Sequence, residues 1–122
     1  MLAAATVMSF TVPAFIGAST SAWEPGAALP LPRTEVAAAA VGTEIMVVGG
    51  YLADGSSARR ADAYSARLNR WRRLPDLPVA VNHAMAAGYR GRLYVVGGYV
   101  ARGEPLRAAY VLERGRWRAL PR

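Results

Sequence analysis

Short apolar runs alternate with turn residues from residue 36 to the end of the chain. Val36–Val41 (VAAAAV) is a run of small residues, and Glu44–Val48 (EIMVV) is rich in β-branched side chains. Arg60–Ser65 and Arg70–Leu74 alternate apolar and polar residues, which is the pattern of half-exposed strands. Turn-forming Gly, Asn and Asp stand between these runs. The sequence therefore predicts four short strands over residues 33–78.

The same order of strands recurs in the second half of the chain. Val47–Tyr51 (VVGGY) returns as Val95–Tyr99, and we call the shift that carries Val47 to Val95 the repeat shift. A tyrosine and a tryptophan also return, seven positions apart in each copy: Tyr64 and Trp71, then Tyr110 and Trp117. We therefore align Tyr64 with Tyr110 and expect the loop before Tyr110 to be two residues shorter. The second set of predicted strands is His83–Gly88, Arg92–Val96, Arg107–Leu112 and Arg116–Leu120.

This order of a small-residue strand, a hydrophobic strand, a Gly-Gly pair, a tyrosine and a tryptophan resembles the kelch repeat. In that family each repeat is one four-stranded blade of a β-propeller. The resemblance implies an all-β chain with one blade at residues 33–78 and a second at 79–122. It also implies that the marker residues are structural, holding blades together: Gly49, Gly50, Tyr64, Trp71, Gly97, Gly98, Tyr110 and Trp117.

Two blades do not close a ring, because propellers have roughly four to eight. Residues 23–32, with Trp23 followed by Leu-Pro-Leu-Pro, are predicted to be a linker and a spare outer strand of a preceding blade. Kelch proteins commonly close the ring by pairing such a strand with the blade at the other terminus. We therefore favour a longer protein with further blades downstream; the alternative is self-association of several copies.

An uncharged apolar stretch precedes the repeats. Leu2–Ala18 carries no charge and is followed by the small residues Ser19–Ala22, so residues 1–22 resemble a secretory signal peptide. The stretch is short for a membrane span, which needs about 20 residues. No Lys or Arg precedes it, so the alternatives are a true start farther upstream and an uncleaved N-terminal anchor. We expect a secreted or periplasmic protein, or one that residues 1–22 anchor to a membrane.

The composition narrows the possible chemistry. Fifteen Arg and no Lys, against eight acidic residues, give a net charge of +7. Six Arg lie between Arg59 and Arg73, but Asp62 interrupts them, so we expect a solvated face and no nucleic-acid partner. There is no Cys and only one His, which excludes thiolate and multi-histidine metal sites within one chain. No metal or cofactor is expected.

The resemblance places a ligand at the face where the propeller channel opens, where each inner strand begins. The repeat shift superposes Glu35 on His83 and Thr34 on Asn82. The candidate ligand-binding residues are Arg33, Glu35, Asn82 and His83, with Tyr51 and Tyr99 from the longer loops. Structural alternatives are an ordinary loop histidine for His83 and, for Arg33, an arginine packed against a tryptophan.

No catalytic motif is present: the sequence contains no phosphate loop, no G-x-S-x-G and no H-E-x-x-H. We therefore expect a non-catalytic module that recognises protein or carbohydrate through its channel-face loops. The alternative is part of a carbohydrate-active enzyme resembling the sialic-acid epimerases, which are also kelch propellers. Glu35 and His83 would then be the acid and base, with further catalytic residues outside this chain.

Overall fold

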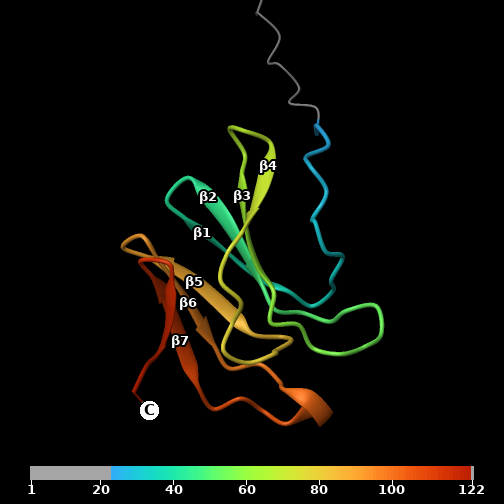
Figure 1. Cartoon of the computed structure of the whole chain (residues 1–122), viewed down its shortest axis with the longest axis vertical. Helices are drawn as coiled ribbons and strands as arrows, with labels where there is room; N and C mark the ends of the chain where they lie inside the picture. Colours follow the sequence, from blue (N-terminus) through green and yellow to red (C-terminus); the bar gives the residue numbers. More distant parts are fainter. Residues whose placement is uncertain (1–22, 122) are drawn as a thin grey trace, which may run out of the picture.

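The chain folds into two four-stranded antiparallel sheets, as the computed structural model describes for residues 23–121 (Figure 1). Blade 1 contains β1 (Ala37–Val41), β2 (Glu44–Val48), β3 (Ala61–Ser65) and β4 (Arg70–Arg73). Blade 2 contains β5 (Met85–Tyr89), β6 (Arg92–Val96), β7 (Ala109–Glu113) and β8 (Arg116–Ala119), with one 3-10 turn, η1 (Ala101–Gly103). The all-β prediction is confirmed. The predicted leader, residues 1–22, lies outside the described residues.

The two blades share one strand register under the repeat shift. Val48 of β2 pairs with Ala61, and Val96 of β6 pairs with Ala109. The loops that follow β2 and β6 have equal length, and each is closed by equivalent isolated bridges: Tyr51 with Thr34 and Ser57, and Tyr99 with Asn82 and Pro105. The sequence repeat is therefore also a repeat of the backbone structure.

The register corrects the alignment of the tyrosines. Tyr64 pairs with Trp71, and the two rings lie 4.9 Å apart between centroids. The residue that pairs with Trp117 is Leu112, whereas Tyr110 pairs with Ala119. The difference of two residues lies in the outer hairpin, because four residues join β3 to β4 and only two join β7 to β8. Tyr110 therefore occupies the position of Asp62, and the expected shorter loop before it is wrong.

The inner strands β1 and β5 pack side by side, so that the two sheets enclose an apolar core (Figure 1). A Cβ atom at Gly88 of β5 would overlap the carbonyl oxygen of Ala40 on β1. Only small residues permit this approach. The core between the sheets is aliphatic and includes Val41, Val48, Ala61, Ala63, Leu93, Val95 and Leu112.

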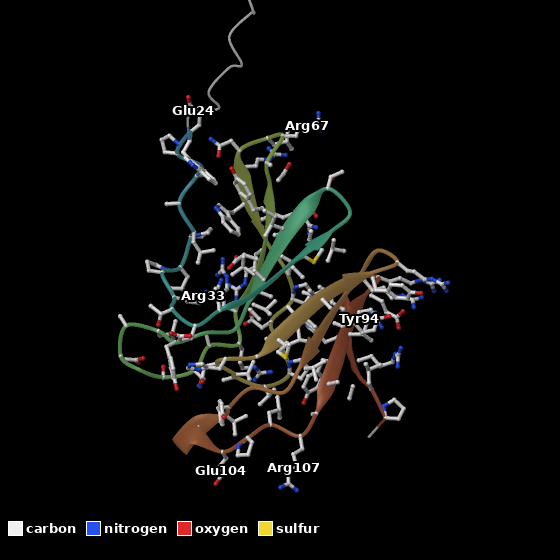
Figure 2. All side chains as sticks on the ribbon, turned by 180° about the vertical axis from the view of Figure 1, so that it is seen from behind. Glu24, Arg33, Arg67, Tyr94, Glu104 and Arg107 are labelled. Atoms are coloured by element: carbon white, nitrogen blue, oxygen red, sulfur yellow. The ribbon has the colours of Figure 1, made fainter. Side chains whose placement is uncertain are left out.

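Residues 23–33 run along the edge of blade 1 that β4 forms and contain no strand (Figure 2). The spare outer strand predicted within residues 23–32 would belong to a preceding blade and stays a prediction. Within residues 23–121 β4 lies beside this segment, but no backbone ladder joins the two. Trp71 Nε1 donates to the carbonyl of Ala27 at 2.7 Å, and Trp117 Nε1 donates to the carbonyl of Pro75 at 2.8 Å. The segment thus follows the course of the linker between the blades. No helix in the described part of the chain could cross a membrane.

Candidate functional site

Two residues at equivalent positions of the two blades meet where the inner strands begin. Nε2 of His83 lies 3.3 Å from Oε2 of Glu35, and the side chains are 47% and 54% exposed. The backbone N–H of His83 also donates to the carbonyl of Glu35 at 3.2 Å. Because this hydrogen bond fixes the backbones relative to one another, the contact between the side chains is built into the packing of the blades.

Two tyrosines frame the imidazole. The ring of Tyr51 lies 5.8 Å from the ring of His83 between centroids, at 79°, and the ring of Tyr99 lies 6.1 Å away at 84°. Both contacts are edge-on, the geometry that aromatic quadrupoles favour. Tyr99 is 46% exposed. With Asn82 these residues form a patch that we call the entrance cluster: Glu35, Tyr51, Asn82, His83 and Tyr99.

Asn82 holds the imidazole in place and, being buried, offers a ligand almost no surface, so it positions the site rather than binding ligand as predicted. It is 2% exposed, and its amide nitrogen donates to Ser57 Oγ at 2.8 Å and to the carbonyl of Tyr99 at 3.1 Å. Its remaining oxygen lies 2.8 Å from Nδ1 of His83 and accepts the hydrogen bond of that nitrogen. Nε2 is therefore turned toward Glu35 and solvent. Ser57 was not singled out from the sequence, because its pairing with Tyr51 is visible only in the structure.

The backbone of both residues is in the left-handed region, with φ of 48° at Glu35 and 50° at His83. Glycine is the residue that adopts this conformation without cost, and another residue there costs about 1–2 kcal/mol. Side chains kept at such positions are a reason to look for function.

A cavity of about 430 Å³ opens beside the entrance cluster. It lies between the two long loops and the linker that joins the blades. Its lining is mostly small and neutral: Tyr51, Gly55, Ser56, Ser57, Ala80, Asn82, Val100, Ala101 and Gly103.

Arg33 does not belong to this cluster, and its predicted role in ligand binding is wrong. Its side chain is 0% exposed, with Nη2 2.7 Å from Oδ2 of the equally buried Asp62 (Figure 2). Nη1 donates to the carbonyl of Arg60 at 2.6 Å. Burial lowers the pKa of Arg33 from its ordinary value despite the attraction of Asp62. The guanidinium ties the N-terminal segment to blade 1 and is closed to any ligand.

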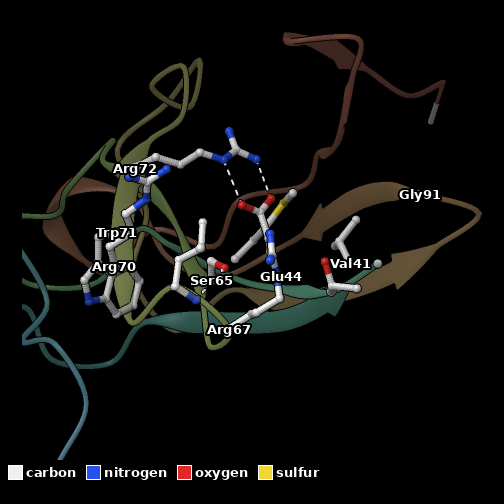
Figure 3. A pocket seen from close by; sticks show the side chains of 12 residues that line it. Val41, Glu44, Ser65, Arg67, Arg70, Trp71, Arg72 and Gly91 are labelled. Carbon is white, nitrogen blue, oxygen red and sulfur yellow. Dashed lines mark hydrogen bonds and ion pairs between the residues drawn. The ribbon is translucent and has the colours of Figure 1, made fainter.

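A larger cavity, about 770 Å³, lies at the opposite end of the blades (Figure 3). The side chain of Arg72 donates two hydrogen bonds to the carboxylate of Glu44, at 2.9 and 2.5 Å. These bonds lower the pKa of Glu44 from its ordinary value. Within the Arg59–Arg73 cluster, Arg60 and Arg73 are likewise paired, with Asp62 and Asp76. Three of the six clustered arginines are therefore paired with carboxylates of the same blade, and Arg60 shares Asp62 with Arg33.

Residues 23–121 contain no group of three or more His, Asp or Glu side chains that could hold a metal ion. Comparison with family models matches residues 32–78 to the Kelch motif. That interval begins in the N-terminal segment, contains β1 to β4 and ends in the linker to blade 2. No curated protein matches the chain.

Proposed function

Because residues 32–78 match the Kelch motif, we propose that the two blades form a kelch-type protein-binding module whose contact surface is the entrance cluster. The observation that carries the proposal is the contact of Glu35 with His83 at 3.3 Å between equivalent positions of successive blades. Polar groups at one position of successive blades face a common opening, as a binding site requires.

The chemistry of the cluster suits a peptide segment. It offers a carboxylate, an imidazole nitrogen and the exposed ring of Tyr99 within one patch. Asn82 and the packed loops hold these groups in place before a partner arrives, which reduces the entropic cost of binding.

Panning a phage-displayed peptide library against the full chain tests this function. We expect enriched peptides to lose at least about tenfold in affinity with Glu35→Gln or His83→Ala, since one such contact is worth about 1.4 kcal/mol or more. Arg67→Ala, at the opposite end of blade 1, is the control and should bind normally. Absence of enriched peptides, or peptides indifferent to both cluster variants, would overturn the proposal.

A second candidate is a carbohydrate-active enzyme of the epimerase kind. The distance of 3.3 Å between Glu35 and His83 favours it, because a carboxylate in contact with an imidazole orients that ring and stabilises its protonated form when the ring exchanges a proton with a substrate. Its test is exchange of sugar anomers or epimers followed by NMR in the presence of the chain. Turnover that disappears with Glu35→Gln would support the enzyme, and no turnover on a panel of sialic acids and hexosamines would exclude it.

We also propose that the module is exported. The support is the uncharged stretch Leu2–Ala18 followed by small residues.

A further inference from the structure

The face of blade 2 that points away from blade 1, which we call its outer face, is apolar, and no segment of residues 23–121 covers it. On blade 1 the equivalent face packs against blade 2, so the two faces can be compared residue by residue under the repeat shift. The exposed fractions at equivalent positions are 5% for Ala37 against 76% for Met85, 7% for Val41 against 58% for Tyr89, and 0% for Val48 against 50% for Val96. The outer face of blade 2 therefore has the composition of a packing surface.

A groove beside this face matches a filled site on blade 1. There, Leu77 N–H donates to the carbonyl of Arg59 at 2.8 Å, and Val81 N–H donates to that of Ala58 at 3.1 Å. Gly50 N–H donates to the carbonyl of Val81 at 2.8 Å, and both Leu77 and Val81 are 0% exposed. On blade 2 the same positions form an open groove of about 380 Å³, lined by Val96, Gly97, Leu106, Arg107, Ala108, Ala109, Leu120 and Pro121.

We propose that a second copy of this chain docks there head to tail, with its N-terminal segment in the groove. Residues 29–33 are the counterpart of 77–81, and Leu29-Pro30 repeats the Leu77-Pro78 that fills the site on blade 1. These three hydrogen bonds use backbone groups, so residues 29 and 33 of the copy can reproduce them whatever their side chains. Nε of Arg59 also donates to the carbonyl of Leu77 at 2.7 Å, and Arg107 stands at the equivalent position of blade 2.

The free face of blade 1 is the complementary surface. Ile45, at 45% exposure, is equivalent to Leu93, which is buried where blade 2 packs on blade 1. Within one chain, blade 2 packs with the face that contains Leu93 against the face of blade 1 that contains Val48. In the proposed contact, blade 1 of the copy packs in the same way, with the face that contains Ile45 against the outer face of blade 2. The copy thus repeats the interface between the two blades of one chain.

One difference between the two interfaces is compensated by side-chain size. Within one chain Gly88 of blade 2 lies against Ala40 of blade 1, and in the proposed contact these two residues exchange places. Ala40 of the copy then occupies the position that Gly88 has within one chain, and its Cβ requires a wider spacing between the inner strands. Met85 and Tyr89 are larger than Ala37 and Val41, which they replace, and so fill that wider gap. Such a head-to-tail contact closes into rings of roughly four to eight blades from two to four copies.

Sedimentation velocity and light scattering on the full chain test the proposal. We expect an assembly of two to four copies that dissociates on dilution toward the monomer of 13.0 kDa. Val96→Glu on blade 2 and Ile45→Glu on blade 1 should each give monomers. Ala66→Glu in the β3–β4 hairpin, exposed and outside both faces, is the matched control and should still assemble.

A mixture of the two variants distinguishes head-to-tail docking from every symmetric contact. Each variant keeps one intact face, so the mixture should form a 1:1 complex and stop there. Circular dichroism confirms that each variant is folded, and Ala38→Glu replaces Ile45→Glu if the latter is not. A wild-type chain that stays monomeric at all concentrations would overturn the proposal and favour the blades of a longer protein as the cover of this face. So would assembly without pairing of the mixed variants.

Discussion

Arg33 and Asp62 form an ion pair at 2.7 Å with both side chains fully buried, and the second blade does without it. At the equivalent positions of the second repeat stand Val81 and Tyr110. One repeat therefore joins its entering segment through charge, whereas the other uses an apolar contact.

Removing one partner of this buried pair should be costly. We expect Arg33→Ala to lower the free energy of unfolding by about 3–5 kcal/mol, because it leaves the Asp62 carboxylate buried with less compensation. Arg73→Ala breaks the exposed pair with Asp76 and should cost only about 0–1 kcal/mol. Urea unfolding of both variants is the measurement. Equal decreases in the free energy of unfolding would contradict the buried position of the Arg33–Asp62 pair.

The double variant Arg33→Val/Asp62→Tyr copies the second blade. Since replacing a buried pair by apolar residues is often neutral, we expect it to be more stable than Arg33→Ala. A double variant less stable than Arg33→Ala would show that blade 1 cannot accept the packing of blade 2.

Gly49 and Gly97, the first glycines of the two Gly-Gly pairs, allow the effect of backbone conformation to be separated from that of steric contact. They have nearly the same φ, 63° and 62°, so an alanine at either adds about 1–2 kcal/mol of backbone strain. A Cβ at Gly49 would also lie 2.5 Å from the carbonyl oxygen of Val81, whereas at Gly97 the nearest atom is 3.8 Å away. We expect Gly49→Ala to be the more destabilised of the two, as measured by thermal unfolding under conditions where both are monomeric.

The left-handed backbone at His83 predicts an ordering of variants. His83→Gly relieves the strain that His83→Ala retains, so the glycine variant should be the more stable by about 1 kcal/mol. Both remove the imidazole and should lose peptide binding alike. Greater stability of the alanine variant in urea would contradict the strained conformation.

The Glu44–Arg72 pair should make stability depend on pH. Because the hydrogen bond from Arg72 lowers the pKa of Glu44, the pair stabilises the fold fully above the unfolded value near 4.5. This contribution is lost as the pH falls through the folded pKa. Glu44→Gln should therefore cost less than about 1 kcal/mol at pH 7, for a pair partly exposed to solvent, and still less in acid. A cost that grows on acidification would have the wrong sign.

The leader proposal predicts cleavage after Ala22. Expression of the full chain in a secreting bacterial host, followed by intact-mass measurement, should give a product that begins at Trp23. Ala22→Arg should block processing, since signal peptidases require a small residue there. A full-length product in the membrane fraction would instead support the anchor.

The positions of the strands follow from local sequence patterns. Runs of small or β-branched residues, two alternating segments and the repeat predicted every strand of residues 23–121 to within about two residues. The shift that places Glu35 opposite His83 also came from the repeat alone. Their separation did not, since it depends on how closely two sheets approach.

Aligning the two repeats by identical residues gave the wrong result where identical residues occupy different positions in the two blades. Tyr64 and Tyr110 are the same residue, but the length of the outer hairpin decides which residue faces which, and it places Tyr110 at the position of Asp62. Arg33 was assigned to the binding face because it precedes an inner strand. Its burial depends on Asp62, which is distant along the chain and which no local pattern connects to it.

The amino-acid sequence by itself determined the order and kind of the strands in the two blades and the period of the repeat, since these depend on neighbours along the chain. Tertiary structure decided which of the polar residues before the inner strands β1 and β5 are exposed and which are buried. That decision depends on contacts between segments brought together by the packing of one sheet on the next, and the same residue type can be a binding group in one blade and a structural tie in the other.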